Sequence, residues 1–273
     1  MQDLMKRITE AVEYIRQHNS SSPQAGIILG SGLGNFATQI KVETEIPYAE
    51  IPHFPVSTVE GHSGKLILGT IAGKRIVAMS GRFHFYEGYS AADVVFPIRV
   101  MKFLGIEVLL ISNAAGSVNP AYAVGDLVVI HDHISFAVPN PLLGPNIQEL
   151  GPRFPDMSEP YKKALINRVK AIAADQQITL HEGVYFGVTG PTFETRAEYK
   201  MIHTLGGDVV GMSTVQEVIT AVHMGLPVVA VSIVTDIGIR EEDNIITHQE
   251  VLEAAALAEP KLTTIFTRLL AEL

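Results

Sequence analysis

The sequence has no cysteine. This absence excludes disulfide bonds, thiolate nucleophiles and cysteine-ligated zinc sites, and it fits an intracellular protein. Basic residues are in the minority, because 20 Lys and Arg stand against 29 Asp and Glu and give a formal net charge of −9. We do not expect nucleic acid as a partner, since neutralising phosphates needs clustered Lys and Arg. Any anionic ligand must be held by local groups, against the global field.

Long apolar segments are also missing. No apolar stretch reaches the roughly 18 residues that a membrane helix needs. The N-terminal segment MQDLMKRITEAVEYIRQHN is amphipathic and lacks the apolar core of a signal peptide. We therefore expect a cytoplasmic protein without a membrane partner. Hydrophobic residues make up 47% of the chain and charged residues 18%, which favours a sizeable core over extended disorder.

Short apolar runs bounded by glycine predict buried strands, because they are rich in β-branched residues and too short for helices. They lie at 25–30, 65–73, 75–81, 107–116, 126–134, 182–190, 208–213 and 226–236. Helical patterns follow a first helix at the N-terminus and lie at 90–104, 159–175, 195–205, 214–224 and 247–271. Strands that alternate with helices predict the α/β class, with a largely parallel or mixed sheet.

The segment 135–158 differs from its surroundings, because it is rich in proline and glycine. We expect an ordered loop here, and loops of this length inside compact domains are usually functional. The chain has no repeat, no linker and no recognisable boundary. We therefore predict one domain over residues 1–273.

The stretch ILGSGLGNFA (28–37) follows a predicted strand and could form a phosphate-binding turn. It is not the dinucleotide fingerprint, because Asn35 stands where the third glycine of G-x-G-x-x-G is required, and the chain has no P-loop motif. A glycine turn of this kind is as often purely structural. The hydroxyl of Ser31 and the nearby backbone N–H groups nevertheless suit an oxyanion.

The stretch GRFHFYEGY (81–89) holds the densest group of functional side chains. It places Arg82, His84, Tyr86 and Glu87 directly after a predicted strand. Arg82 offers a planar fork for phosphate, and His84 offers a hydrogen-bond donor. A single Arg or His in a turn is more often a hydrogen-bonded surface group, but the density of these side chains favours a site.

Three further motifs give weaker signals. Asn113 and two alanines follow a predicted strand, and small residues let a ligand approach the backbone closely. The run HDH (131–133) has no further partner at ligand spacing, so a core or loop role is favoured over a metal site. The run STVQE (213–217) begins a helix with the spacing of a capping box headed by Ser213 or Thr214, and such a helix end also suits an anion.

The stretch VTGPTFETRAEY (188–199) raises a question about Glu194. This carboxylate lies in a turn between a predicted strand and a predicted helix, where it could simply cap the first helical turn. Its neighbour is Phe193, and the turn lies at the end of the sheet where α/β proteins build their sites. Both features favour a binding role.

Seven motifs, in order and at matching separations from about residue 25 to 270, resemble those of the trimeric purine nucleoside phosphorylases. They read GSGLG, GHSGKL, GRFHFYEGY, NAAGSVNP, GPTFETRAE, VVGMSTVQEV and THQEVL. The resemblance implies phosphorolysis, in which inosine, guanosine or their deoxy forms react with phosphate to give the free base and the sugar 1-phosphate, in purine salvage. It also implies a mixed, partly barrel-like sheet flanked by helices, a homotrimer, and neither metal nor organic cofactor.

The same resemblance implies a role for individual residues. Phosphate would be held by Ser31, Arg82, His84, Ser213 and the backbone N–H of Ala114. The ribose would be held by Tyr86, Met212, His248 on the 5′-hydroxyl, and Phe154 from the neighbouring subunit, which would make the loop 135–158 part of an interface. The purine would be held by Phe193, Glu194 and Asp236. The candidate catalytic residues are His84, Glu194, Asp236 and His248.

Elementary chemistry agrees with these implied roles. The bond between sugar and base breaks through an oxocarbenium-like transition state, which leaves positive charge on the sugar and negative charge on the base. A phosphate dianion below the sugar stabilises the first charge, and hydrogen bonds to the purine stabilise the second. Glu194 would accept from N1–H and, in guanine, from the exocyclic amine, while Phe193 packs against the base.

Asp236 departs from the family pattern. Enzymes for 6-oxopurines usually carry Asn at this position, where it contacts N7 and O6 of the base. The related methylthioadenosine phosphorylases carry Asp there, but they lack the Glu of FET and the run FHFYEGY. Two alternatives to an inosine and guanosine phosphorylase therefore stay open. One is a phosphorylase that favours 6-aminopurine nucleosides, and the other is a non-catalytic nucleoside-binding protein on the same fold.

Overall fold

The computed structural model describes residues 2–31, 33–58, 63–239 and 246–273. The strands in this part of the chain are β1 (Ala25–Leu29), β2 (Lys41–Pro47), β3 (Lys65–Ile71), β4 (Lys74–Ser80), β5 (Val108–Ser117), β6 (Leu127–Ile134), β7 (Leu180–Gly187), β8 (Val209–Gly211) and β9 (Val228–Ile237). The α-helices are α1 (Gln2–His18), α2 (Ala91–Val94), α3 (Phe96–Leu104), α4 (Lys163–Asp175), α5 (Arg196–Thr204), α6 (Val215–His223) and α7 (His248–Glu272). Short 3-10 helices are η1 (Gly34–Gln39), η2 (Tyr48–Glu50) and η3 (Phe85–Glu87).

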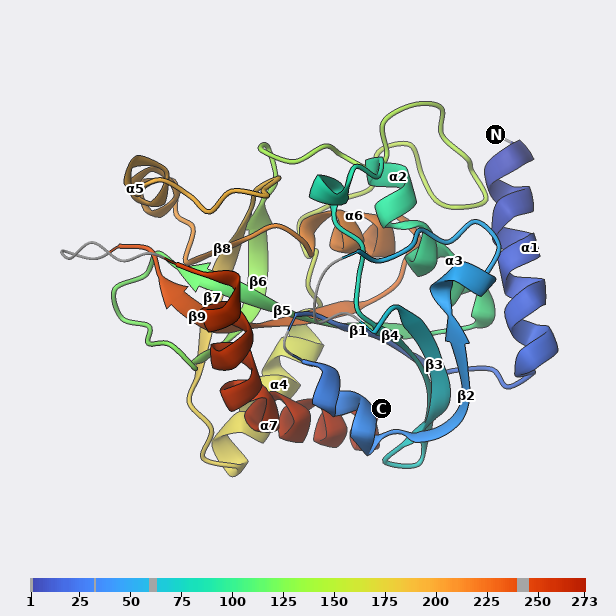
Figure 1. Ribbon diagram of the computed structural model, residues 1–273, viewed down its shortest axis with the longest axis horizontal. Helices are drawn as coiled ribbons and strands as arrows, with labels where there is room; N and C mark the ends of the chain where they lie inside the picture. The colour runs from blue at the N-terminus through green and yellow to red at the C-terminus, as the bar shows by residue number, and fades with distance from the viewer. Residues whose placement is uncertain (1, 32, 59–62, 240–245) are drawn as a thin grey trace.

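All these strands belong to one mixed sheet with the order β2-β3-β4-β1-β5-β8-β7-β6-β9. An additional pairing of β5 with β9 closes the second half of the sheet into a barrel (Figure 1). Strands β4, β1, β5 and β9 run parallel to one another, whereas β8 and β6 run antiparallel to β5 and β9. This is the mixed, partly barrel-like α/β fold that the resemblance implies.

The central strands are continuous apolar runs because both of their faces are covered. Every residue of β1, AGIIL, is buried, and β9 is buried along almost its whole length. Strands of this kind lack polar alternation, which is why glycine-bounded apolar runs predict them. All the predicted strands are present. The prediction missed β2, because this edge strand, KVETEIP, is mostly exposed and contains no apolar run.

Helices cover both sides of the sheet. In Figure 1, α4 and α7 lie below it, and α2, α3 and α6 lie above it. All the predicted helices are present, but the one expected at 90–104 is divided into α2 and α3 at Val95. Pro97 explains the division, because it lies in the first turn of α3, where its missing N–H is harmless, and it would break a continuous helix.

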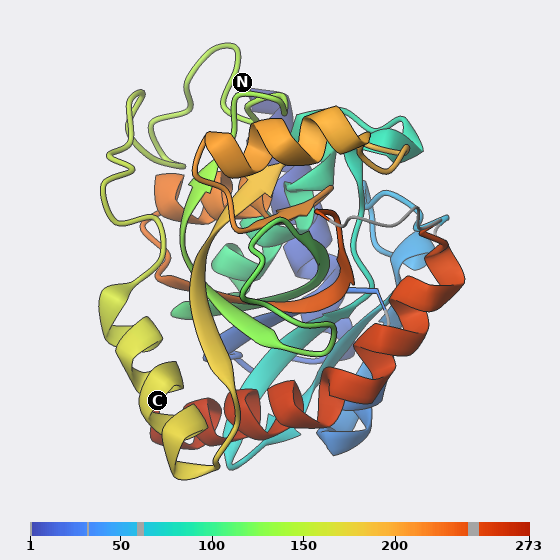
Figure 2. The same ribbon diagram turned by 90° about the vertical axis from the view of Figure 1, so that its left-hand side faces the viewer.

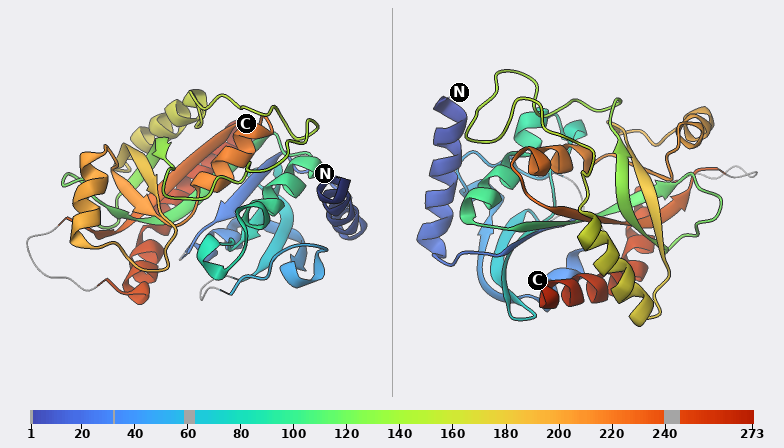
Figure 3. Two further views of the ribbon diagram at one scale, coloured as in Figure 1. Left: turned by 90° about the horizontal axis from the view of Figure 1, so that it is seen from above. Right: turned by 180° about the vertical axis from the view of Figure 1, so that it is seen from behind.

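The long segment 135–158 runs over the surface without helix or strand, as predicted (Figure 2). Helices α1 and α5 lie at opposite ends of the molecule, with the sheet between them (Figure 3). Within the described ranges, no helix is both long and apolar enough to cross a membrane. The C-terminal ends of the parallel strands converge in the middle, and the side chains that follow them surround one cavity.

Candidate active site

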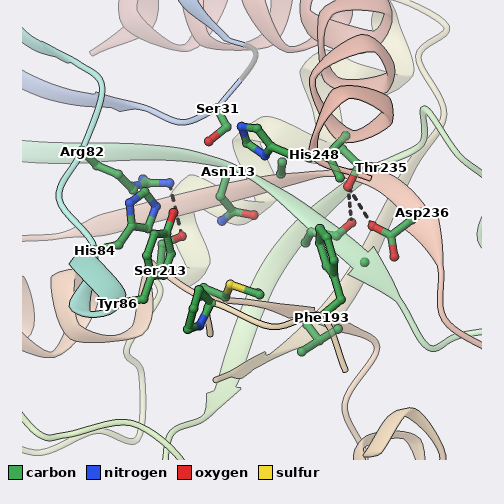
Figure 4. Close-up of a pocket in the computed structure, with 18 of the residues that line it drawn as sticks. Ser31, Arg82, His84, Tyr86, Asn113, Phe193, Ser213, Thr235, Asp236 and His248 are labelled. Atoms are coloured by element: carbon green, nitrogen blue, oxygen red, sulfur yellow. Dashed lines mark hydrogen bonds between the residues drawn. The ribbon is translucent and has the colours of Figure 1, made fainter. Parts of the chain in front are cut away.

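A cavity of about 470 Å³ lies at the C-terminal ends of β1, β4, β5 and β9. All the predicted site residues except Phe154 line it, and they are Ser31, Arg82, His84, Tyr86, Ala114, Phe193, Glu194, Met212, Ser213, Asp236 and His248. Figure 4 shows Arg82, His84 and Ser213 on one side of the pocket and Phe193 and Asp236 on the other. Side chains that are distant in the sequence therefore form two chemically different ends of one cavity.

Arg82 follows β4 and is almost completely buried. Its guanidinium donates from Nε and Nη2 to the two carboxylate oxygens of Glu217, at 2.9 and 3.2 Å. It also donates from Nη1 to Ser213 Oγ at 3.3 Å. A buried cation is tolerated only when it is paired and hydrogen-bonded. The sequence predicts that the guanidinium fork of Arg82 faces phosphate. In the structure, the Nε and Nη2 edge of the guanidinium binds Glu217 instead, and Nη1 lies beside Ser213 at the cavity.

The capping box predicted at the start of α6 is wrong. Thr214 is the N-cap, with φ of 69°, and its side chain makes no capping hydrogen bond. Instead Thr214 Oγ1 accepts from Asn113 Nδ2 at 2.9 Å, while Glu217 binds Arg82. Positive φ is strained for a β-branched residue, and such strain is typical of functional sites. Here it accompanies the turn that brings Ser213 to the cavity.

His84 lies beside a buried carboxylate. Its Nδ1 is 3.2 Å from Glu87 Oε1, and its backbone N–H donates to the same oxygen at 2.8 Å. Glu87 Oε2 accepts from the backbone N–H and the hydroxyl of Thr58, at 2.8 and 2.7 Å. Burial alone would raise the pKa of Glu87, but the hydrogen bonds from His84 and Thr58 lower it to about 2. Glu87 is therefore an anion at neutral pH.

The charge of Glu87 determines the tautomer of His84. An ionised carboxylate can only accept, so the proton of a neutral His84 ring lies on Nδ1 and Nε2 is the atom that titrates. Burial lowers the pKa of His84, and Arg82 lowers it further, although Glu87 and Glu217 act in the opposite direction. The imidazole is therefore neutral at neutral pH in the structure without a ligand.

Small residues let the backbone reach the cavity at two strands. A Cβ on Gly30 would lie 2.8 Å from the carbonyl oxygen of Ser112 and 3.1 Å from Arg82 Nη1, so any larger residue would displace the guanidinium. A Cβ on Gly116, in β5, would lie 2.7 Å from Asp236 Oδ2. Ala114 lines the cavity, and its small side chain lets a ligand approach the backbone there.

Tyr86, Met212 and His248 also line the cavity. The Tyr86 ring stacks on His84 with a centroid distance of 4.7 Å, and burial raises the pKa of Tyr86 to about 12, so its hydroxyl keeps its proton. Gly190 has φ of 65° and lies against Met212, where a Cβ would collide with the sulfur. His248 is the first residue of α7, and a capping box between Thr247 and Glu250 fixes that helix end.

The far end of the cavity contains Phe193, which is 39% exposed, and Glu194. The helix cap is not Glu194, because Thr195 and Glu198 form the capping box of α5. This answers the question that the turn at 188–199 raises. Burial raises the pKa of Glu194, and the carboxylates of Asp236 and Glu198 raise it further, whereas hydrogen bonds from its own backbone N–H and from Tyr199 act in the opposite direction. Glu194 is thus an acid that the cap leaves available to a ligand.

Asp236 lies near the end of β9 and is 6% exposed. Its Oδ1 accepts from the hydroxyl of Thr235 at 3.1 Å, and this hydroxyl is also 3.3 Å from the carbonyl oxygen of Ala115. The carboxyl group therefore lies in the interior of the fold, at the same end of the cavity as Glu194.

Phe154 is the exception among the predicted residues. Its side chain is 87% exposed on the long loop, where the guanidinium of Arg153 lies over the ring at 5.6 Å. Within the chain it is apart from the cavity. Parts of two motifs lie outside the described residues, namely Gly32 of GSGLG and Gly61 and His62 of GHSGKL.

The sequence interpretation missed Glu217, Thr58 and Thr235, and it assigned no role to Glu87. A signal for Glu217 existed, because a buried arginine requires a carboxylate partner, but the spacing STVQE favoured a helix cap. In the HDH run, His133 Nδ1 lies 3.1 Å from the hydroxyl of Tyr161, and His131 Nδ1 lies 3.9 Å from Glu182 Oε1. In the described part of the chain, no three His, Asp or Glu side chains are grouped to hold a metal ion.

Comparison with known proteins gives a consistent result. Residues 24–271 match the family model described as the phosphorylase superfamily. The chain is 51% identical over 247 residues to purine nucleoside phosphorylase 1 of Bacillus subtilis (strain 168), covering 90% of this chain and 91% of the relative.

Solved structures agree. Isoform 2 of purine nucleoside phosphorylase from Schistosoma mansoni, in complex with cytosine and ribose-1-phosphate, is 45% identical with a TM-score of 0.94, and the match covers 98% of this chain and 96% of that one. A Schistosoma mansoni purine nucleoside phosphorylase in complex with adenosine is 42% identical with a TM-score of 0.93, and the match covers 98% and 97%. The chain belongs to the purine nucleoside phosphorylases of the phosphorylase superfamily.

Proposed function

We propose that the chain catalyses the reversible phosphorolysis of inosine, guanosine and their deoxy forms to the free purine and the sugar 1-phosphate. The observation that supports this substrate range is the division of one cavity into two ends. Arg82 and Ser213 give one end hydrogen-bond donors, to which His84 adds a donor when a bound anion favours protonation of its Nε2. Phe193 and Glu194 form an aromatic and acidic end. A phosphate and a 6-oxopurine need these two kinds of surroundings, with the sugar between them.

The donor-rich end would hold phosphate by directed hydrogen bonds more than by net charge. Glu217 balances the charge of Arg82, and Glu87 adds a negative charge beside His84. Serine hydroxyls at Ser31 and Ser213, and the backbone at Ala114, complete this end of the cavity. A phosphate dianion bound here would lie against the sugar and stabilise the positive charge that develops on it.

The acidic end would stabilise the leaving base. Glu194, when ionised, accepts from N1–H of a 6-oxopurine and from the exocyclic amine of guanine. Asp236, when protonated, donates to N7, where negative charge accumulates as the bond to the sugar breaks. Hydrogen bonds that strengthen as charge develops lower the barrier, whereas equal binding of substrate and transition state does not. His248 and Tyr86 would orient the sugar between the two ends.

A specific observation supports a second candidate, a phosphorylase that favours 6-aminopurine nucleosides. Asp236 occupies the position where 6-oxopurine enzymes usually carry Asn, and it is buried beside the base end of the cavity. An ionised Asp236 can accept from the N6 amine of adenosine. The Schistosoma mansoni relative in complex with adenosine shows that this nucleoside is bound within the family.

We further propose that the active form is a homotrimer, in which Phe154 reaches the ribose end of a neighbouring site. An exposed phenylalanine on a long loop is suited to an interface. Phosphate is the co-substrate, and no metal or organic cofactor takes part in the proposed chemistry. A single domain, a cytoplasmic location and a role in purine salvage stay predictions.

Initial rates with inosine, guanosine, adenosine and xanthosine, each with and without phosphate, test the proposal. We expect phosphate-dependent release of hypoxanthine and guanine, with adenosine cleaved more slowly. Adenosine cleaved faster than inosine would favour the second candidate. A protein that binds nucleosides without any phosphate-dependent cleavage would contradict both.

A further inference from the structure

Glu259 is a buried carboxyl group outside the cavity. It lies in α7 and is 2% exposed. Its Oε1 accepts from the backbone N–H of Phe36 at 2.7 Å, and the two residues are 223 positions apart in the sequence. Phe36 lies in η1, which begins three residues after Ser31, a residue that lines the phosphate end of the cavity. The hydrogen bond therefore connects the C-terminal helix to the segment that carries Ser31.

A carboxyl group at this position is costly to bury. Burial raises the pKa of Glu259. Hydrogen bonds from the backbone at Phe36 and Asn35 lower it, but by less than burial raises it. An apolar residue would pack in the same space without this penalty. What the carboxyl adds is an acceptor for an N–H in the first turn of η1, where the backbone has no partner inside the helix.

A second contact holds η1 against the same helix. Phe36 and Phe266 meet edge to face with a centroid distance of 6.2 Å, and both rings are buried. Phe266 follows Glu259 by seven residues, or about two helical turns, so both side chains lie on one face of α7. This pair of contacts fixes both the position and the orientation of η1.

The same helix also carries a cavity residue. His248 is the first residue of α7 and precedes Glu259 by eleven residues, and the helix, which contains Pro260, bends between its two halves (Figure 1). His248 lines the ribose end of the cavity, and Ser31 lines the phosphate end. Helix α7 thus carries the cavity residue His248, and through Glu259 it also contacts the segment that follows the cavity residue Ser31.

We propose that Glu259 is a positioning residue for phosphate: through the N–H of Phe36 it fixes η1, and hence Ser31, relative to the His248 end of α7. The inference rests on the proposed function, because it assigns phosphate to the Ser31 end of the cavity. It predicts that loss of the acceptor weakens phosphate binding while the binding of the nucleoside changes little.

The experiment is calorimetric titration of phosphate into the wild type and three variants. Glu259→Leu removes the acceptor, and Glu259→Gln keeps an amide oxygen that can accept from Phe36. Leu270→Ala is the matched control, because Leu270 is a fully buried residue of α7 in the last turn of the helix. Melting temperatures and the KM values for phosphate and inosine are measured for all four proteins.

We expect Glu259→Leu to raise the phosphate Kd by about tenfold, which corresponds to the net value of a typical buried hydrogen bond. Its inosine KM should change by less than about twofold, and Glu259→Gln should restore most of the phosphate affinity. Leu270→Ala should lower the melting temperature but leave the phosphate Kd unchanged. Equal weakening in Glu259→Leu and Leu270→Ala, no weakening in Glu259→Leu, or no rescue by Glu259→Gln would each overturn the proposal.

The two proposals can fail separately. If the wild type binds phosphate but cleaves no nucleoside, the proposed function is wrong, and the calorimetric comparison still decides the role of Glu259. If the wild type cleaves inosine in the presence of phosphate and Glu259→Leu binds phosphate normally, only the positioning role is wrong.

Discussion

Arg82 and Glu217 are 135 positions apart in the sequence and form a buried ion pair at the phosphate end of the cavity, joined by hydrogen bonds of 2.9 and 3.2 Å. Their side chains are only 2% and 4% exposed. Removing one partner of such a pair leaves a buried charge without compensation. Glu217 therefore both orients the guanidinium and balances its charge, so in the proposed function a bound phosphate would meet a directed donor at Nη1.

The substitution Glu217→Gln should test this pair. Gln keeps the shape of the side chain but removes the negative charge, so the free energy of unfolding should fall by about 3–5 kcal/mol. A bound anion would replace the missing charge, so saturating phosphate should raise the melting temperature more in the variant than in the wild type. Thermal unfolding with and without phosphate measures both effects.

The control is Glu45→Gln, which removes the partner of Lys65 in an exposed ion pair. Such pairs contribute about 0–1 kcal/mol, and this one lies far from phosphate in the proposal, so neither stability nor the phosphate effect should change much. A Glu217→Gln protein as stable as the wild type would show that Arg82 is compensated by other groups.

The protonation of His84 should make anion binding depend on pH. Burial lowers the pKa of His84 in the unliganded protein, and a bound dianion would raise it, because opposite charges favour the imidazolium. The complex therefore binds more protons than the free protein, and affinity should fall as pH rises between the two pKa values. Sulfate is a suitable probe, because it stays a dianion throughout and its own titration does not interfere.

Calorimetric titration of sulfate from pH 5.5 to about pH 9 should show this fall, together with proton uptake from the buffer. Two titratable groups touch the His84 ring: the pKa of Glu87 is lowered to about 2 and that of Tyr86 is raised to about 12, so neither changes charge in that range. Arg82 and Glu217, which also lie near His84, are paired with each other. His84→Gln should bind sulfate with a nearly constant affinity. A pH-independent affinity in the wild type would show that His84 does not gain a proton with the anion.

Much of the fold is predictable from the sequence, because its central strands are covered on both faces. The run VVAVSIVTDI of β9 has no polar alternation, and only a buried strand suits it. The edge strand β2 is different, since KVETEIP draws its stability from pairing with β3 and carries no local hydrophobic signal. Local pattern alone cannot indicate a strand of this kind.

The site is predictable where its residues lie in one motif, and not where they depend on distant partners. Arg82 and His84 stand out because GRFHFYEGY is dense in polar side chains. Glu217 does not, because its spacing from Thr214 is that of a capping box and its true partner lies on another strand end. The spacing of residues within one motif does not reveal contacts with residues far away in the sequence.

Glu194 should be essential for 6-oxopurine nucleosides. We expect Glu194→Ala to lower kcat/KM for guanosine by roughly a hundredfold to a thousandfold, because losing a preorganised partner for developing charge costs about 2.7–4 kcal/mol. Steady-state kinetics measure the loss. The control is Glu198→Gln, since Glu198 belongs to the cap of α5 and should affect stability more than turnover. A decrease of less than about fivefold for Glu194→Ala would place the base elsewhere.

Phe154 should act across a subunit boundary. Phe154→Ala and Glu194→Ala chains should each have little activity alone, because each lacks one part of every site. When the two are unfolded and refolded together, some sites should combine an intact Glu194 with an intact Phe154 from the neighbour, so activity should return. Refolding each variant alone provides the control. No recovery in oligomers shown to be mixed would contradict the proposed role of Phe154.

Asp236 should set the choice between 6-oxo and 6-amino bases. A 6-oxopurine presents acceptors at both O6 and N7, so an ionised Asp236 repels it, whereas a protonated Asp236 donates to N7. The carboxyl is buried, and burial disfavours the charged form. The negative charge of Asp236 helps to raise the pKa of Glu194, so the two carboxyl groups are close enough to affect each other.

We therefore expect Asp236→Asn to decrease the cleavage of adenosine, because the neutral amide oxygen of Asn accepts from N6 more weakly than an ionised carboxylate does. Inosine cleavage should stay equal or improve, since Asn donates at every pH. For the same reason we expect inosine kcat/KM to depend less on pH in the variant than in the wild type. Competing rates with adenosine and inosine, measured across pH for both proteins, give the result. An unchanged adenosine-to-inosine ratio would mean that Asp236 does not touch the base, and its burial beside Thr235 would then serve the fold alone.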